Sequence, residues 1–85
     1  MNLQDLLNTV CGEVSDIKTS KKLGISRQMF SHYRNGRKNP SDEVLDKIIE
    51  LTGLNPVDVY MAAYAEKISN PIVAEAFRNQ SHLAA

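Results

Sequence analysis

The stretch SDIKTSKKLGISRQMFSHYRNGRKNPS, residues 15–41, decides the fold of this chain of 85 residues. Within it, Ser15 and Ser26 each precede a run with helical character, at the position where a serine hydroxyl caps a helix. Gly24 lies between the two runs, and glycine readily adopts the positive φ with which a chain leaves a helix. Two short helices joined by so tight a turn cross at a steep angle, which requires a small residue such as Ser20 at the crossing. The stretch therefore predicts a pair of crossed helices.

The second helix of this pair divides into an apolar and a polar face when it is projected at about 100° per residue. The inner face, expected to pack on the core, consists of Ser26, Met29, Phe30 and Tyr33. The outer face consists of Gln28, Ser31, His32 and Asn35, with Arg27 and Arg34 on one flank. Amide, hydroxyl and guanidinium groups are the ones that hydrogen-bond to base edges in DNA. The outer face therefore indicates contact with a nucleic acid.

The charged residues are segregated along the chain, although ten basic and ten acidic side chains give a formal net charge of zero. No Asp or Glu lies between Ile17 and Ser41. The basic residues of this segment are Lys18, Lys21, Lys22, Arg27, Arg34, Arg37 and Lys38. The rest of the chain has three basic residues against all ten acidic ones. The affinity for phosphate depends on the electrostatic potential within about 8–10 Å and not on the net charge of the chain. The basic segment therefore indicates that it binds a polyanion, in preference to the interpretation that it is only a solvated surface.

Helix signals also recur outside the central stretch. A first helix is indicated by apolar residues at helical spacing, namely Leu3, Leu6, Leu7 and Val10. Ser41 and Gly53 have the residue types that begin and end a further helix. Asn55-Pro56 and Asn70-Pro71 each place a capping Asn before a Pro at the first helical position, which predicts helices over 56–68 and 71–79. The apolar side of the first of these is expected to consist of Val57, Tyr60, Met61 and Tyr64.

We therefore expect an all-α protein of five or six helices that forms one structural domain. Strand signals do not recur, and no linker within the chain is long enough to separate two domains. The expected parts are a core at residues 1–54, C-terminal helices at 55–79 that pack on it, and a frayed tail at 80–85.

The order of these features resembles the Cro and phage-repressor type of helix-turn-helix, also called the xenobiotic-response-element family. The resemblance rests on KKLGIS at 21–26, the aromatic residues after it, NGR at 35–37, and Pro40-Ser41 opening another helix. It covers residues 3–54 and implies a lambda-repressor-like domain, with its helix-turn-helix at 16–35 and a C-terminal helical extension. The last 30 residues are more weakly similar to the extra helices of small regulators from filamentous phages and prophages.

The resemblance implies that the second helix of the motif enters the major groove of duplex DNA. The matching candidates for base contacts are Arg27, Gln28, Ser31 and His32. The candidates for phosphate contacts are Lys18, Lys21, Lys22, Arg34, Asn35, Arg37 and Lys38. Two residues depart from the family pattern. Asp16 replaces a polar amide that donates to phosphate, so that contact is in doubt and Asp16 is expected to act as a second cap. Thr19 replaces a usual aliphatic residue, which should cost some packing.

The C-terminal helices carry more apolar surface than they need to complete the core. The residues concerned are Tyr60, Met61, Tyr64, Ile68, Ile72, Val73 and Phe77. Regulators with this motif gain affinity by pairing two such helices one DNA turn, about 34 Å, apart. We therefore hypothesise that these residues form an isologous homodimer interface. The alternative is that they only complete the core of the monomer.

The function that follows is that of a transcription regulator, a phage or prophage repressor that binds a palindromic operator in double-stranded DNA as a dimer. One alternative is an antitoxin or co-regulator whose C-terminal helices bind a partner protein. Another is a protein-interaction module built on the same scaffold.

Catalysis, a metal site and a cofactor are not predicted, so the chain is not expected to be an enzyme. It has no Gly-rich phosphate loop and no nucleophile-and-base motif, and Cys11, His32 and His82 lack ligand spacing. Cys11 lies on the apolar side of the first helix, where we expect a small buried hydrophobe. Neither a signal-like beginning nor an apolar run of about 20 residues is present. We therefore expect no membrane partner and a cytoplasmic, nucleoid-associated protein.

Overall fold

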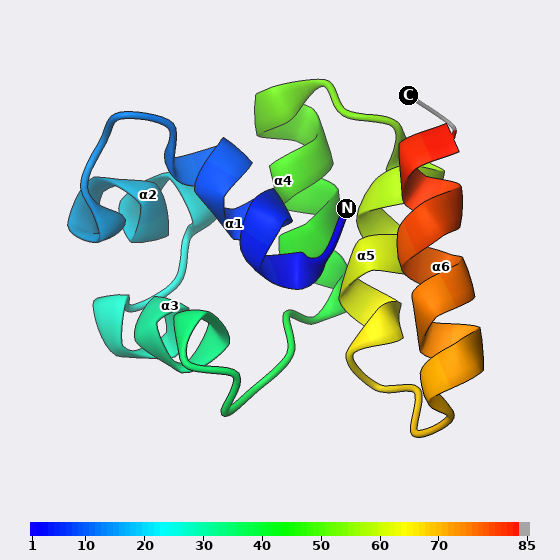
Figure 1. Cartoon of the computed structure of the whole chain (residues 1–85). Coiled ribbons are helices and arrows are strands. Elements are labelled where there is room, and N and C mark those ends of the chain that lie inside the picture. The colour runs from blue at the N-terminus through cyan, green and yellow to red at the C-terminus, as the bar shows by residue number, and fades with distance from the viewer. Residues whose placement is uncertain (84–85) are drawn as a thin grey trace.

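The computed structural model describes residues 1–83, with the side chains of residues 1–79, and over that range it consists of six helices without a strand. The helices are α1 (Leu3–Cys11), α2 (Asp16–Leu23), α3 (Arg27–Arg34), α4 (Asp42–Thr52), α5 (Pro56–Ala65) and α6 (Pro71–Leu83). The all-α prediction is therefore confirmed. In Figure 1, α1 and α4 form the middle of the molecule, α2 and α3 one end, and α5 and α6 the other.

Most helices begin where the sequence places a capping side chain. Ser41 Oγ accepts from the backbone N–H of Val44, and Asn55 Oδ1 accepts from the N–H groups of Val57 and Asp58. These bonds satisfy donors that the first turn of a helix leaves unpaired. At α1 the cap is Asn2, whose side chain accepts from the Asp5 N–H while the Asp5 carboxylate accepts from the Asn2 N–H. This capping box was not predicted.

The core lies where α1, α4 and α5 meet and is extended by α3. Its fully buried apolar side chains include Leu3, Leu6, Leu7, Phe30, Leu45, Ile48 and Val59. Phe30 is the one contributed by α3, so the position of that helix depends on how this ring packs. Removing apolar area of this kind from water contributes roughly 25 cal/mol per Å².

The two C-terminal helices differ from the prediction in their lengths. The α-helical part of α5 stops at Ala65, because the N–H groups of Glu66, Lys67 and Ile68 bond to carbonyls three residues back and form a tighter turn. Helix α6 continues to Leu83, four residues beyond its predicted end, through most of the segment that we expected to be frayed. Ala84 and Ala85 of that segment lie outside the described residues.

The buried face of α5 also differs from the prediction. Val57, expected on the apolar side, is 59% exposed, whereas Val59, Ala62 and Ala63 are buried. The physical reason is that α5 packs on α1 and α4 and also on α6. Small alanines allow neighbouring backbones to approach closely on more than one side, so a single apolar stripe does not describe this helix.

Two tyrosines of α5 are hydrogen-bonded to carboxylates in the first half of α4. Tyr60 donates its hydroxyl hydrogen to Asp46 Oδ1 at 2.6 Å, and Tyr64 donates to Asp42 Oδ1 at 2.6 Å. Their rings stack with centroids 5.9 Å apart. The hydrogen bond to Asp46, together with burial and the nearby carboxylates, raises the pKa of Tyr60 to about 12. These contacts tie α5 to α4 only while the hydroxyl groups keep their protons.

The raised pKa of Tyr60 predicts a loss of stability in alkali. The pKa in the unfolded chain is near 10, so the stabilisation is complete below pH 10 and is lost as the pH rises towards 12. Urea denaturation at pH 8 and pH 11 should show a larger fall in unfolding free energy for the wild type than for Tyr60→Phe. Equal falls in the two proteins would contradict this role of the Asp46 hydrogen bond.

Candidate nucleic-acid interface

The turn between α2 and α3 has the geometry that the sequence predicts. Ser15 Oγ accepts from the Lys18 N–H, and Ser26 Oγ accepts from the Met29 N–H. Gly24 has a φ of 72°, and the next N–H, that of Ile25, bonds to the Ser20 carbonyl at 3.0 Å. Because this bond closes the end of α2 around a left-handed residue, a side chain at position 24 would strain the backbone.

Where the two helices cross, α2 contributes two buried hydroxyl side chains, and each of them makes a hydrogen bond. Ser20 is buried, and its hydroxyl donates to the Ile17 carbonyl at 2.7 Å. Thr19, which replaces an aliphatic residue of the family pattern, is also buried and donates to the Ser15 carbonyl at 3.0 Å. Neither hydroxyl is left without a hydrogen bond, so the polar replacement at Thr19 carries no penalty for an unpaired group.

Helix α3 presents the polar face that the projection predicts. Phe30 and Tyr33 are buried, and burial raises the pKa of the Tyr33 hydroxyl, which fits its predicted place in the core. Met29 is half-buried, but Ser26, expected on the inner face, is exposed because it precedes the helix and caps it. On the opposite side Gln28 and Ser31 are exposed and His32 is half-buried. Arg27, on the flank, is also exposed. Asn35, exposed at the end of the helix, donates to Ser31 Oγ at 3.3 Å. All four predicted base-contact residues therefore lie on one short helix, whose buried side chains are Phe30 and Tyr33.

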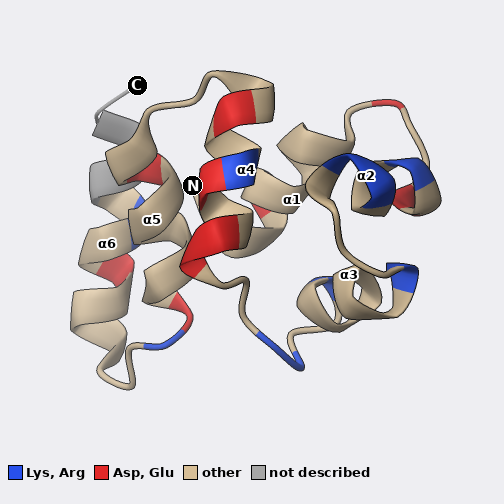
Figure 2. Ribbon diagram, turned by 180° about the vertical axis from the view of Figure 1, so that it is seen from behind, with Lys and Arg blue, Asp and Glu red and all other residues tan. Residues whose placement is uncertain are grey.

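The basic residues gather at the same end of the molecule. Six of the seven cations of the segment between Ile17 and Ser41 are exposed, namely Lys18, Lys21, Lys22, Arg27, Arg37 and Lys38. Figure 2 shows them on α2, on α3 and on the loop after α3, whereas α4 carries four acidic residues and one basic residue, and the segment after α4 carries both signs. The segregation seen along the chain is therefore also a segregation in space.

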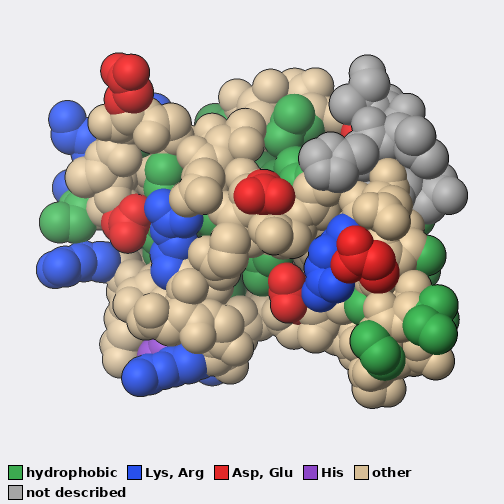
Figure 3. All heavy atoms as spheres, in the orientation of Figure 1, with side chains coloured by type: hydrophobic (Ala, Val, Ile, Leu, Met, Phe, Trp, Pro, Cys, Tyr) green, Lys and Arg blue, Asp and Glu red, His purple; other side chains and the backbone are tan. Residues whose placement is uncertain are grey.

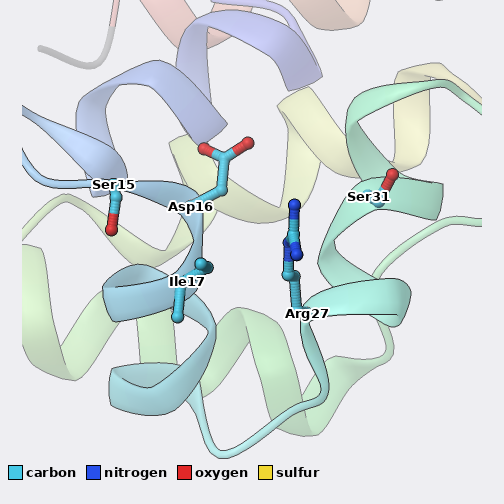
Figure 4. Close-up of a pocket in the computed structure, with 5 residues that line it drawn as sticks. All are labelled: Ser15, Asp16, Ile17, Arg27 and Ser31. Atoms are coloured by element: carbon cyan, nitrogen blue, oxygen red, sulfur yellow. The ribbon is translucent and has the colours of Figure 1, made fainter.

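A cavity of about 290 Å³ lies between the start of α2 and the outer side of α3. Its lining consists of Ser15, Asp16, Ile17, Arg27 and Ser31. In Figure 4 the guanidinium of Arg27 extends into the space between the helices, towards the side from which Asp16 approaches. Two candidate base-contact residues thus border a recess that also contains an acidic side chain.

Asp16 does not act as the second cap that we expected. The side chain that caps α2 is that of Ser15, while an oxygen of Asp16 lies 3.7 Å from an Arg34 nitrogen and accepts a weak bond from Cys11 Sγ at 3.5 Å. The reason is that Arg34 reaches back from the end of α3 to the start of α2. Arg34, a predicted phosphate contact, is therefore the one cation of the basic segment that is engaged inside the protein.

The residues of the predicted dimer interface divide into two groups. Four of them line an apolar cavity of about 200 Å³, formed by Tyr60, Met61, Tyr64 and Phe77. Ile72 and Val73 of α6 are 80% and 42% exposed, and apolar side chains at the start of α6 are visible in Figure 3. Ile68 is half-buried in the turn before α6. The first group is half-buried and lines a recess that is open to the surface, whereas Ile72 and Val73 face outwards.

Cys11 is buried, as predicted. Among the described residues no group of His, Cys, Asp or Glu is arranged to hold a metal ion, and the side chain of His82 lies outside them. No helix in the described part of the chain is long and apolar enough to span a membrane.

Comparison with known proteins agrees with this geometry. Residues 15–59, more than half of the chain, match the helix-turn-helix family, and the match covers α2, α3, α4 and the beginning of α5. No curated protein and no solved structure matches the chain. From the match, together with the capped α2–Gly24–α3 turn and its polar outer face, we conclude that the chain belongs to the helix-turn-helix family of DNA-binding transcription regulators.

Proposed function

We propose that the protein is a repressor that binds a palindromic operator in double-stranded DNA as a homodimer, and that the operator is that of a phage or prophage. The observation that carries the proposal is that two features occur together at one end of the molecule. The outer face of α3 is free of core contacts and carries Gln28 and Ser31, and the same end of the molecule carries the exposed cations. That the operator is one of a phage or prophage rests on the resemblance of the sequence to phage regulators.

In this proposal α3 is the recognition helix and lies in the major groove. The base contacts come from Arg27, Gln28, Ser31 and His32, all from its first six residues. An arginine pairs with guanine and an amide with adenine, in each case through two hydrogen bonds, whereas a hydroxyl suits either base. His32 is half-buried, so its contact is more restricted than the contacts of Gln28.

The phosphate contacts come from residues that flank the recognition helix. Asn35, Arg37 and Lys38 follow it in the loop before α4, and Lys18, Lys21 and Lys22 lie on α2. Contacts to phosphate fix the register of the protein on the duplex but carry little sequence information. Each neutralised phosphate releases counterions, which makes the affinity fall as the salt concentration rises.

Footprinting on the DNA that flanks its own gene tests the function. We expect one protected region with two symmetric half-sites, and competition by unrelated duplex should not remove the protection at physiological salt. If the protein protected no sequence and did not bind duplex DNA even at low salt, a protein-interaction role would replace the proposal.

The proposed dimer interface is the outer face of α6. Ile72 is the most exposed large apolar residue of the described chain, and it borders a hollow of about 510 Å³ that also includes Ala76. The protruding residue and the hollow lie one helical turn apart on the same face. Two copies related by a two-fold axis could therefore each insert Ile72 into the hollow of the other. Apolar side chains as exposed as Ile72 are costly to leave in water.

Sedimentation of Ile72→Glu at micromolar concentration tests the dimer. The variant should be monomeric and should protect half-sites only at much higher concentration, by about tenfold or more. Leu51→Glu, which changes a 45% exposed leucine at the end of α4, is the matched control and should remain dimeric. A wild type that is monomeric yet binds its operator tightly would contradict the dimer. Recovery of the wild type with one stoichiometric partner protein, which Ile72→Glu does not bind, would favour the co-regulator or antitoxin instead.

A further inference from the structure

The recognition helix is held in place mainly by side chains. Its backbone comes close chiefly to that of α2, while its C-terminal half is tied to α1 by two polar contacts. Gln4 donates from Nε2 to the Tyr33 carbonyl at 3.2 Å, and Arg34 donates from Nη1 to Asn8 Oδ1 at 2.5 Å. The angle of α3 relative to α1 therefore depends on individual hydrogen bonds as well as on the buried rings.

Arg34 is the point at which all three helices meet. Besides its bond to Asn8 of α1, its guanidinium lies 3.7 Å from the carboxylate of Asp16 in α2 and 3.6 Å from Cys11 Sγ. The same group lies over the ring of Phe30 in its own helix, 5.7 Å from the centroid. With a side chain that is 25% exposed, Arg34 is much less accessible than a residue that reaches out to a phosphate.

We propose that Arg34 is a positioning residue, which fixes the orientation of the recognition helix through Asn8 and Asp16, and that it does not contact DNA. The inference rests on the proposed function, since it assumes that α3 reads bases. It also gives the anion Asp16 a role within residues 15–41, where every other charged residue is basic: Asp16 is the counter-ion of Arg34.

The chemistry of the side chain favours arginine at this position. A guanidinium is planar and carries five N–H donors in a rigid fork, so it can bond to Asn8 while one edge faces Asp16 and its plane lies over Phe30. A lysine has a single ammonium group on a flexible chain and cannot keep these three contacts together. A phosphate contact, in contrast, can also be made by lysine, which supplies a point charge near the backbone.

Positioning matters because base readout tolerates little displacement. Gln28 and Ser31 lie on the same helix as Arg34, one to two turns away from it. If α3 tilts or rotates, both side chains move relative to the base edges, whereas contacts to phosphate made by flexible lysines adapt. Loss of positioning should therefore reduce specific binding more than non-specific binding.

The test compares Arg34→Gln and Arg34→Lys with the matched control Arg37→Gln, which removes an exposed cation from the loop after α3. For Arg34→Gln we expect the ratio of operator affinity to non-specific affinity to fall by about tenfold or more, with an unchanged salt dependence. Arg34→Lys should behave similarly. Arg37→Gln should lower both affinities alike and reduce the slope of log affinity against log salt by about one per bound protomer. Denaturation of each variant gives the fraction of protein that is folded, and each affinity is calculated for that folded fraction.

Two outcomes would overturn the proposal. If Arg34→Gln flattened the salt slope as Arg37→Gln does, and Arg34→Lys restored it, Arg34 would be a phosphate contact. If Arg34→Gln lowered only the stability and left the affinity ratio of the folded protein unchanged, its role would be structural alone.

A measurement without DNA separates this inference from the proposed function. In the free protein, Arg34→Gln should speed hydrogen exchange of the α3 amides severalfold relative to those of α4 and α5. Asp16→Asn should do so to a smaller extent, because it leaves the bond between Arg34 and Asn8 in place. The double variant should add little to Arg34→Gln alone, because the contact of Asp16 with α3 is the one to Arg34. Unchanged α3 exchange would refute the positioning role, even if the protein proved to bind DNA. A wild type that bound no DNA, with α3 exchange altered as expected, would refute the proposed function alone.

Discussion

Replacing Gln28 with alanine should weaken operator binding by about 1–3 kcal/mol per half-site and relax the preference at one base position. Gln28 is exposed on the outer face of α3, so its amide is available to make two hydrogen bonds to an adenine. Both copies of a dimer lose this contact, which doubles the effect on a full operator. Titration of the operator, and of variants substituted at each position of the half-site, measures the affinity and locates the affected base pair.

Lys38→Ala is the control for this prediction, since Lys38 is an exposed cation of the loop after α3. It should weaken binding to every sequence alike and lower the slope of log affinity against log salt by about one per bound protomer. If Gln28→Ala left both the affinity and the base preference unchanged, the outer face of α3 would not be the reading surface.

Replacing Phe30 with alanine should lower the free energy of unfolding by about 3–5 kcal/mol. The ring is fully buried where α3 meets the core, and the Arg34 guanidinium lies over it. Small domains are stable by only about 5–15 kcal/mol, so a large share of the native stability would be lost. Urea denaturation followed by circular dichroism measures the effect.

Phe30→Leu provides the comparison, because it keeps most of the apolar volume and should be clearly less destabilising. A loss of less than about 1 kcal/mol for Phe30→Ala would mean that α3 is held in place by its other contacts and not by this ring.

The helix-turn-helix could be predicted from the sequence because its signals are local. A capping serine needs only the N–H groups of the next turn, as at Ser15 and Ser26, and a glycine at a helix end needs only its own φ, as at Gly24. The outer face of α3 also follows from spacing alone, since Phe30 and Tyr33 define the buried side of so short a helix. The family match covers the same stretch.

The features that were wrong or missed depend on contacts between residues far apart in the chain. Helix α5 packs against helices on more than one side, and its own pattern cannot reveal how many neighbours it has. The contact of Arg34 with Asn8 spans 26 residues, so a charge count assigned Arg34 to the basic surface. The sequence likewise does not indicate that Asp58, at the first turn of α5, is buried. There the positive end of the helix favours a carboxylate.

The separation of acidic and basic residues also governs how the protein first meets DNA. A molecule without net charge is not drawn to a duplex from afar, but this one is 34 Å long, while ions at physiological strength screen charges over about 8 Å. A duplex that comes near α2 and α3 is therefore attracted by the cations there and hardly affected by the carboxylates of α4, α5 and α6. An approach from the opposite end, where the segment of α5 and α6 carries acidic and basic residues in nearly equal number, gains no such attraction. The encounter itself thus selects the productive orientation before any base pair is recognised.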